Sequence, residues 1–484
     1  MNVQHRTSNV EHRMGKTLFF RHLSGLFGLG ILVFLFISGC AMGPDFKPPV
    51  VETPKNYRFD KVPVETMVNL KWWELFDDPV LYALVSQALS NNKNLKIAAA
   101  RVEQARAYVG FTRADQYPGV FIDAGAGTGN FGGGVRSETR NSNYYAGPAL
   151  SWELDFWGKF RRASESARAQ LIASEYGLRT IQIGLISAVV GSYYLLLDFH
   201  QRVKISKDTL KSREESLDII QKRFDRGIIP ELDVNQAQIQ KEIAAAAIPQ
   251  YERSVAQTEH VISILLGKLP EPIKTGKELN LETAPPTVPM GLPSTLLERR
   301  PDIVQALYLL ESQTADIGVA EAMRFPAISL TGMLGLASSE LSGIVSQGGA
   351  WSVNGGLFGP IFEFYKNVRR VEIEESKTKE FLYSYENTVL TAFKEVEDSL
   401  VEIDTFKEQM AAVKRKEKAA KNAYRLAKLR YDKGVSTYLE VLETERALFS
   451  AQLELSELKQ QYLSGYVKLY KALGGGWTTK KDEG

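Results

Sequence analysis

The sequence predicts an α+β membrane protein in which one structural unit is built twice. Two long runs have the periodicity of coiled-coil helices, and two shorter stretches alternate apolar and polar residues with a period of two. The same features recur about 207 residues apart. Residues 223–228 (Arg-Phe-Asp-Arg-Gly-Ile) and 430–435 (Arg-Tyr-Asp-Lys-Gly-Val) align without a gap. This repetition indicates a single duplicated architecture rather than two independent domains.

Residues 1–39 have the pattern of a lipoprotein signal peptide. A positively charged stretch precedes the apolar run 26–37, whose length is typical of a secretory leader. Both Met1 and Met14 are possible starts of translation. The basic residues of the charged stretch are Arg13, Lys16 and Arg21.

Cys40 follows this leader and is the only cysteine in the chain. With the preceding Ile-Ser-Gly it resembles the lipobox of bacterial lipoproteins, which implies that Cys40 is lipidated and becomes the mature N-terminus. An uncleaved anchor or a chance cysteine is the alternative. A single cysteine leaves no disulfide or cysteine–metal site. Ala41 stands where an aspartate would favour inner-membrane retention, so the resemblance implies the outer membrane.

The charge of the chain gives no reason to expect a nucleic acid partner. The full sequence has 59 basic and 57 acidic residues, and the leader holds four of the former and one of the latter, so the mature chain has a formal charge of −1. Only two histidines remain after the leader, His200 and His260, both within helical runs. We therefore expect no metal site and no cofactor apart from the covalent lipid on Cys40.

The tether and the first repeat follow the leader. Residues 40–78 are predicted to be a lipidated tether, because five prolines prevent regular structure. The first repeat, 79–267, begins with a helical pattern over 79–113, which Pro118 ends. A β-hairpin at 119–157 has one apolar face and one polar or small face. The apolar face holds Val120, Ile122, Ala124, Ala126, Tyr144, Ala146, Pro148, Leu150, Trp152, Leu154 and Phe156.

A glycine-rich stretch at 127–132 lies within this hairpin and matches the pattern GxGxxG. A dinucleotide-binding loop requires a helix directly after the glycines. Strand-like sequence follows here instead. We therefore expect a flexible loop between the two strands rather than a cofactor site.

A helical pattern over 161–224 is the longest in the first repeat. Apolar residues recur at every seventh position, the spacing of a supercoiled seam. At 1.5 Å per residue this helix would be roughly 95 Å long. A tip near 225–231 follows, and a second helix then runs to about residue 266. The seam residues are Val189, Leu196, Val203, Leu210, Leu217 and Phe224.

The second repeat, 293–474, follows a proline-rich linker at 268–292 and precedes a C-terminal tail at 475–484. It is predicted to hold the same elements in the same order: a helix, a β-hairpin at 327–363 and a long helical hairpin with its tip near 432–438. The apolar strand positions are Ile328, Leu330, Leu334, Leu336, Trp351, Val353, Leu357 and Ile361. The two repeats therefore supply four amphipathic strands.

Strands of about ten residues with one apolar face are suited to a membrane barrel, and aromatic residues such as Trp152, Trp157 and Trp351 are suited to the membrane interfaces. One chain has only four such strands. Open sheet edges are not tolerated in lipid. Several chains must therefore pool their strands, and long helices of this kind need partners to close a cylinder.

Three motifs carry a resemblance to the TolC-type outer membrane factors, within the NodT-like lipoprotein branch. They are Gly43–Phe46 after the lipobox cysteine, Trp152–Lys159 and Leu292–Ile303. The resemblance covers essentially the whole mature chain. It implies a homotrimer with a 12-stranded barrel in the outer membrane and a 12-helix periplasmic tunnel. It also implies a passive exit duct for drugs or other small molecules, docked to a periplasmic adaptor and an inner-membrane pump.

The same resemblance assigns candidate functional residues near the two tips. Gly227 and Gly434 would hold the turns that the adaptor contacts, or would serve only to allow a positive φ. Glu440 and Glu443 occupy positions where family members have acidic residues at a periplasmic gate, although both could simply be solvated. Some relatives have an arginine where this chain has Ser436. The remaining candidate partners of the gate carboxylates are Asp233 and Tyr431.

Two other classes of function are alternatives to an exit duct. An enzyme is disfavoured, because the sequence has no zinc-ligand spacing, no phosphate-binding loop in context and no GxSxG motif. A periplasmic coiled-coil adaptor lipoprotein would share the lipid anchor and the long helices. It would not require four amphipathic strands with aromatic residues. The sequence does not identify the cargo, the adaptor or the pump.

Overall fold

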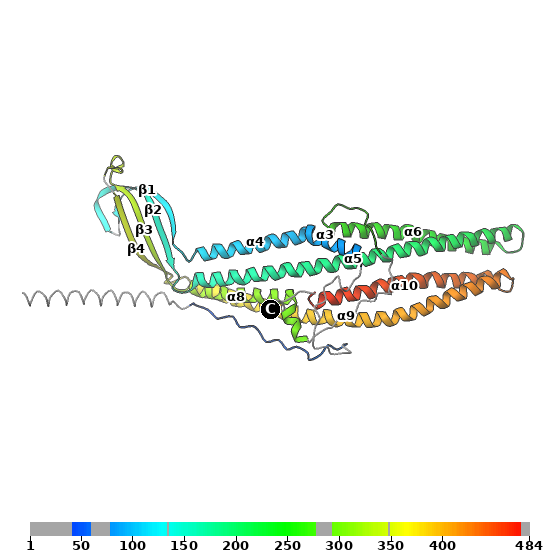
Figure 1. Ribbon diagram of the computed structural model, residues 1–484. Coiled ribbons are helices and arrows are strands. Elements are labelled where there is room, and N and C mark those ends of the chain that lie inside the picture. Colours follow the sequence, from blue (N-terminus) through cyan, green and yellow to red (C-terminus); the bar gives the residue numbers. More distant parts are fainter. Residues whose placement is uncertain (1–40, 60–77, 133–134, 277–292, 347–348, 476–484) are drawn as a thin grey trace, which may run out of the picture. The chain divides into compact units, whose positions relative to one another are not determined.

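The computed structural model describes residues 41–59, 78–132, 135–276, 293–346 and 349–475 (Figure 1). The leader, Cys40, most of the linker and nearly all of the C-terminal tail lie outside these residues. The chain divides into two compact units. The first comprises Met1–Pro49, Gln104–Ile172 and Tyr308–Tyr383 and holds the four described strands. The second comprises Val50–Glu103, Ala173–Leu307 and Ser384–Gly484 and holds most of the two helical hairpins.

Two helical hairpins of equal size dominate the second unit. Helices α5 (Lys159–Asp225) and α9 (Lys366–Asp432) each have 67 residues, and α6 (Glu231–Leu265) and α10 (Tyr438–Ala472) each have 35. Within that unit α6 runs back along α5 and α10 along α9 (Figure 1). The helix predicted at 161–224 is therefore confirmed: α5 begins two residues before the predicted start and ends one residue after the predicted end. Of the predicted seam residues, Val189 and Leu196 are buried in a hydrophobic cluster with residues of α10, whereas Phe224 near the tip is exposed.

The single helix predicted over 79–113 is wrong, because the chain forms α3 (Pro79–Asn91) and α4 (Lys93–Ala114) with a break at Asn92. Asn92 has an extended backbone. Its side-chain amide donates to the carbonyl of Leu265 at the end of α6 (2.9 Å), and its side-chain oxygen accepts the N–H of Leu95 (3.0 Å). These bonds satisfy polar groups that helix ends leave unpaired, so they compensate for the break.

Arg300 breaks the equivalent helix of the second repeat. It separates η1 (Pro293–Thr295) and α7 (Leu296–Arg299) from α8 (Pro301–Ala322). Its buried guanidinium donates to the carbonyl of Ala472, the last residue of α10 (3.2 Å), and pairs with Asp302 (2.6 Å) and Glu395 (2.7 Å). Both repeats thus fasten a helix break to the end of their own helical hairpin.

A single antiparallel sheet in the order β1-β2-β3-β4 forms the other major feature. Its strands are β1 (Gly119–Gly132), β2 (Val135–Leu154), β3 (Ala327–Ser338) and β4 (Gly349–Phe358), with a short helix η2 (Leu341–Gly343) between β3 and β4. Strands β1 and β4 are its two edges. The structure thus has four strands within the predicted hairpin ranges.

The predicted glycine-rich loop at 127–132 is wrong, because these residues continue β1 to Gly132. Gly127 pairs with Asn143 on β2, and an added Cβ there would lie 2.8 Å from the Asn143 side-chain oxygen. At Gly125 an added Cβ would lie 2.5 Å from the Tyr145 hydroxyl. Glycine in β1 therefore makes room for large cross-strand neighbours.

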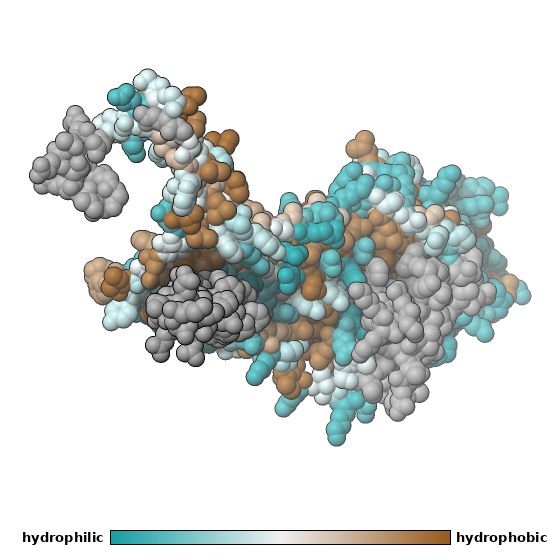
Figure 2. All heavy atoms as spheres, turned by 60° about the vertical axis from the view of Figure 1, so that its left-hand side comes forward, coloured by the Kyte–Doolittle hydropathy of each residue, from teal (hydrophilic) through white to brown (hydrophobic). Residues whose placement is uncertain are grey.

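The strand register aligns the apolar positions of all four strands on one face. Val120 pairs with Leu150, Leu150 with Gly332, and Gly332 with Val353. Figure 2 shows brown, hydrophobic side chains gathered along one side of the sheet. Most of the alternate positions hold polar or small residues, as where Ser151 pairs with Thr331 and Thr331 with Asn354. The apolar face includes the exposed residues Val120, Ile122, Leu334, Trp351, Val353 and Leu357.

A buried charged link joins α5 to α10 in the helical unit. The Asp198 carboxylate accepts hydrogen bonds from the Ser456 hydroxyl (2.5 Å) and the Arg202 guanidinium (2.7 Å). Burial raises the pKa of Asp198, and the bonds from Ser456 and Arg202 only partly oppose this rise. A carboxyl with a raised pKa in the fold favours folding most below the ordinary pKa of aspartate, and this contribution is lost as the pH rises through the folded value.

We expect Asp198→Asn to remove that pH dependence. Between about pH 4 and pH 8, the free energy of unfolding of the variant should therefore increase relative to that of the natural protein. Each unit of pKa shift corresponds to about 1.4 kcal/mol of this difference. The difference in melting temperature should increase in the same direction. Thermal unfolding of detergent-extracted protein across this range measures the difference. Asp218→Asn, at an exposed ion pair on the same helix, is the control and should show no trend. A constant or falling difference for Asp198→Asn would contradict the assignment.

Candidate functional site

The tips of the two helical hairpins have the same backbone geometry. Gly227 and Gly434 have φ of +71° and +72°. The N–H of Ile228 donates to the carbonyl of Arg223, and the N–H of Val435 to that of Arg430, both at 3.0 Å. Each hydrogen bond joins residues five positions apart, as in a Schellman motif, in which glycine adopts the left-handed conformation. A Cβ at either glycine would meet no described atom within 4 Å, so only the backbone conformation requires glycine there.

The opposite ends of the hairpins use the same motif in crowded surroundings. Gly267 and Gly474 end α6 and α10 with φ of +72° and +88°. A Cβ would lie 2.5 Å from the carbonyl oxygen of Asn91 at the first position and 3.0 Å from that of Arg299 at the second. Packing within the chain therefore occupies these two helix ends, whereas space remains open around the tip glycines.

Exposed apolar side chains flank both tip glycines, and the sequence reasoning did not single them out. Ile228 and Val435 follow the glycines directly, and both are about two-thirds exposed. Leu232 and Leu439, four residues further on, are also exposed. The signal was present in the sequence, because each pair occupies equivalent positions of the duplicated chain. Equivalent apolar groups at both tips form a surface that a partner protein can contact.

A cluster of aromatic residues packs the two hairpins together just behind the tips. The Tyr431 and Tyr438 rings lie 5.4 Å apart, and the Arg223 guanidinium lies 4.6 Å from the centre of the Tyr431 ring. The buried Tyr431 hydroxyl has no hydrogen-bond partner among the described atoms. Partial burial raises the pKa of Asp233, near the start of α6. Apolar members of the cluster are Ile220, Ala237, Ala427, Val441 and Leu442.

The two candidate gate glutamates lie on the first turns of α10 with exposed side chains. The Glu440 carboxylate lies 3.4 Å from the Arg430 guanidinium, and that of Glu443 lies 3.3 Å from Arg446. Within the described part of the chain, the ion-pair partners of both glutamates are thus arginines that the sequence reasoning did not name. The expected partners lie elsewhere: Asp233 is in the first turn of α6, and Tyr431 belongs to the aromatic cluster.

A second charged group is buried deeper between the hairpins. The guanidinium of Arg213 on α5 donates to the carbonyl of Gln240 on α6 (2.5 Å) and lies 3.7 Å from the Glu445 carboxylate on α10. Burial raises the pKa of Glu445 and lowers that of Arg213. Among the described atoms, one oxygen of Glu445 and two nitrogens of Arg213 have no hydrogen-bond partner. This pair links three helices at an energetic cost, as buried charges do.

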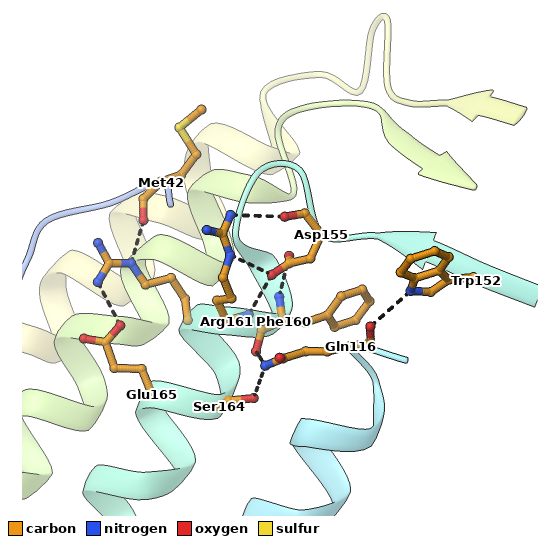
Figure 3. Close-up of polar contacts among 9 residues, drawn as sticks. Met42, Gln116, Trp152, Asp155, Phe160, Arg161, Ser164 and Glu165 are labelled. Atoms are coloured by element: carbon orange, nitrogen blue, oxygen red, sulfur yellow. Dashed lines mark hydrogen bonds and ion pairs between the residues drawn. The ribbon is translucent and has the colours of Figure 1, made fainter. Parts of the chain in front are cut away.

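The base of the sheet is fastened to the helices by the hydrogen bonds in Figure 3. The Asp155 carboxylate accepts the N–H groups of Phe160 and Arg161, each at 2.9 Å, and so caps the start of α5. The Trp152 indole donates to the carbonyl of Gln116 (3.1 Å), whose side-chain amide donates to the Ser164 hydroxyl (2.8 Å). These bonds tie the end of β2 to the end of α4 and to the first turn of α5.

Arg162 holds the first described residues of the chain against α5. Its guanidinium donates to the carbonyls of Met42 (2.9 Å) and Gly43 (3.1 Å) and to the Asp45 carboxylate (2.8 Å). Burial opposes its charge, but the bonds to Asp45 and Glu165 outweigh burial and raise the pKa of Arg162. In the sequence, Gly43–Phe46 is only a motif shared with the family that the chain resembles. The structure gives the first part of that motif a physical role.

Within the ranges that the structure describes, no group of three or more His, Cys, Asp or Glu side chains could hold a metal ion. Cys40 lies outside those ranges.

Comparisons with known proteins match both repeats. The family described as outer membrane efflux protein matches residues 84–268 and 292–475. The probable outer membrane lipoprotein SilC of Salmonella typhimurium is 32% identical over 93% of this chain and 98% of its own length. The toluene efflux pump outer membrane protein TtgC of Pseudomonas putida is 34% identical over 93% of this chain and 96% of its own. The solved structure of the outer-membrane channel OprN superposes with a TM-score of 0.83 and 32% identity, covering 90% of this chain and all of that one.

Proposed function

The chain belongs to the outer membrane efflux protein family and is the outer membrane channel of an efflux system; from this membership we propose that three copies assemble into one passive exit duct for small molecules. A periplasmic adaptor and an inner-membrane pump would deliver the cargo. The relatives are named as an efflux pump outer membrane protein and an outer-membrane channel, which disfavours the alternative of a coiled-coil adaptor. We propose no catalytic activity for the chain.

One observation supports the trimer most directly: a four-stranded sheet with one apolar face and two open edges. Open edges cannot stay unpaired in lipid, because no water is available for their backbone groups. Pairing β4 of one copy with β1 of the next would close the edges, and three copies would form a barrel of 12 strands. The polar and small residues of the other face would then line the channel.

The lipid anchor is part of the same proposal. Cys40 would carry the lipid, and Arg162 would fix the following residues beside the base of the sheet through the carbonyls of Met42 and Gly43. The strand ends would then lie near the membrane surface to which the lipid chains attach.

We expect Leu330→Arg, on the apolar face, to impair membrane insertion by about 2–4 kcal/mol if the residue lies near the membrane midplane. Leu150→Arg should act similarly. Thr331→Arg is the matched control, because the adjacent side chain points to the polar face and would stay in water. The amount of trimer extracted from outer membranes and the drug susceptibility of the cells measure the effect. Normal assembly and export with arginine at residues 330 and 150 would refute the membrane assignment of this face.

The tips are proposed as the surface that docks with the adaptor. Replacing Gly227 and Gly434 with bulky residues should abolish export while leaving trimers in the membrane, but these changes also strain the turns. Ile228→Ser combined with Val435→Ser leaves the glycines in place and removes only exposed apolar groups. We expect this pair to weaken capture of the cognate adaptor about tenfold, equivalent to about 1.4 kcal/mol.

Leu269→Ser is the control for the tip experiment, because Leu269 is an exposed leucine just beyond the opposite end of α6. Adaptor capture by this variant should match that of the natural protein. Undiminished capture by the Ile228→Ser, Val435→Ser variant would remove the docking role of the tips.

The gate is the third part of the proposal. In a trimer Glu440 and Glu443 would each form a ring of three carboxylates, which selects for cations at a constriction. We expect Glu440→Gln with Glu443→Gln to lower both the cation selectivity and the divalent-cation block of single channels in planar bilayers. Glu454→Gln, at an exposed ion pair further along α10, should change neither. Unchanged selectivity and block in the double variant, in a correctly assembled trimer, would exclude the ring.

A further inference from the structure

The duplicated chain covers one aromatic corner and leaves its equivalent exposed. The Trp157 ring, between β2 and α5, stacks on Phe325 with centroids 4.5 Å apart, and its indole donates to the Pro326 carbonyl (2.9 Å). The sequence repeat places Tyr365 at the position of Trp157, and Tyr117 at that of Phe325. Tyr365 is 74% exposed and Tyr117 is 59% exposed. The structure therefore contains both halves of a second corner contact, but a single chain does not join them.

The adjoining helices show the same difference between the repeats. The part of α8 before Phe325 is buried at Ala315, Ile317, Ala320 and Ala322. Its equivalent in α4 exposes Tyr108 and Phe111. A Cβ at Gly318 on α8 would lie 2.5 Å from the Met42 carbonyl, whereas a Cβ at the equivalent Gly110 on α4 would meet no described atom within 4 Å. Among the described residues, helix α4 thus lacks the cover that its counterpart has.

The start of α9 is uncovered in a matching way. Helix α5 buries Ala167, Ala169 and Ala173 in its first turns, and its Ser166 hydroxyl lies 2.9 Å from that of Ser312 on α8. The equivalent part of α9 exposes Ile373 and Tyr383. Each chain therefore presents an unoccupied α4 surface and an unoccupied α9 surface that are counterparts of two surfaces in contact.

We propose that the α4–β1 corner of one copy of this chain, centred on Tyr117, packs against the β4–α9 corner of a second copy, centred on Tyr365. The contact repeats between chains the one that Phe325 and Trp157 make within each chain. This inference rests on the proposed trimer and specifies which residues join its subunits. The corners adjoin β1 and β4, the two open sheet edges, so pairing of those edges brings the corners together.

The backbone at Tyr365 provides a separate argument for a partner at this place. Phe364 and Tyr365 have φ of +48° and +62°, values that bulky residues adopt only under constraint. In the first repeat the left-handed residue at this turn is Gly158, with φ of +77°. Both aromatic rings of the second turn are largely exposed in the single chain. A second copy stacked on them supplies packing that favours this strained conformation.

Cysteine cross-linking in membranes tests the proposal against little background, because the chain has one cysteine, Cys40, in its lipobox. Tyr117→Cys and Tyr365→Cys are made singly and co-expressed with different tags, so that a bond between positions 117 and 365 must join two chains. After mild oxidation we expect a dimer carrying both tags from the mixture, and a ladder up to a covalent trimer from the double variant. Each single variant alone should remain monomeric on a denaturing gel.

Leu334→Cys paired with Tyr365→Cys is the matched control. Leu334 is exposed on the apolar face but lies seven residues along β3 from Ala327, about 23 Å at 3.3 Å per residue. A disulfide needs Cα atoms within about 7 Å, so this pair should not cross-link. If it cross-links as well as the first pair, the bond reflects collision rather than packing and the inference is refuted.

Two outcomes separate this contact from the proposed trimer. If the natural protein extracted from membranes is not a trimer by mass, the proposed assembly fails and the contact fails with it. If it is a trimer but the pair at 117 and 365 does not cross-link in trimeric variants, only the contact fails. Where the cysteine variants do not assemble, a photoreactive benzoylphenylalanine at position 365 keeps an aromatic ring there. It should label residues around Tyr117 of a second chain, and labelling elsewhere would overturn the proposal.

Discussion

The unpaired backbone groups along the outer edges of β1 and β4 are the constraint on which the rest of the structure depends. The sheet has an apolar face that needs lipid, yet lipid does not tolerate open edges. A single chain can place the apolar face in lipid or keep the backbone groups of its edge strands in water, but it cannot do both. A closed ring of strands, as in the trimer proposed above, would satisfy both for the four strands that the structure describes.

Because the chain is duplicated, the same few kinds of contact recur in both repeats. The ends of α6 and α10 receive the same kind of cap, one from Asn92 and one from Arg300, although the two side chains share neither size nor charge. The four glycine turns likewise have one geometry, but two are crowded by the chain and two face open space. The repeats thus share a framework, and they differ in which surfaces remain available to other molecules.

Buried charge is concentrated where the helical hairpins meet. Asp198 with Ser456, and Arg213 with Glu445, each link α5 of one hairpin to α10 of the other. Buried pairs of this kind add little net stability compared with apolar packing, but breaking one leaves an uncompensated charge. Such links resist small displacements of one hairpin against the other. They therefore suit a protein whose tips we propose to gate a channel.

The sequence by itself determined the repeat, the extent of α5 and the alternation of the strand faces, because periodicity is a local property of the chain. It did not determine the breaks at Asn92 and Arg300, since each depends on a carbonyl more than 170 positions away. The glycine-rich residues 127–132 were predicted to form a loop, but they pair with β2 and form a strand. The arginine beside Glu440 and the role of Arg162 also emerged only from the fold. Ion pairs and caps join residues by distance in space, and tertiary structure alone sets that distance.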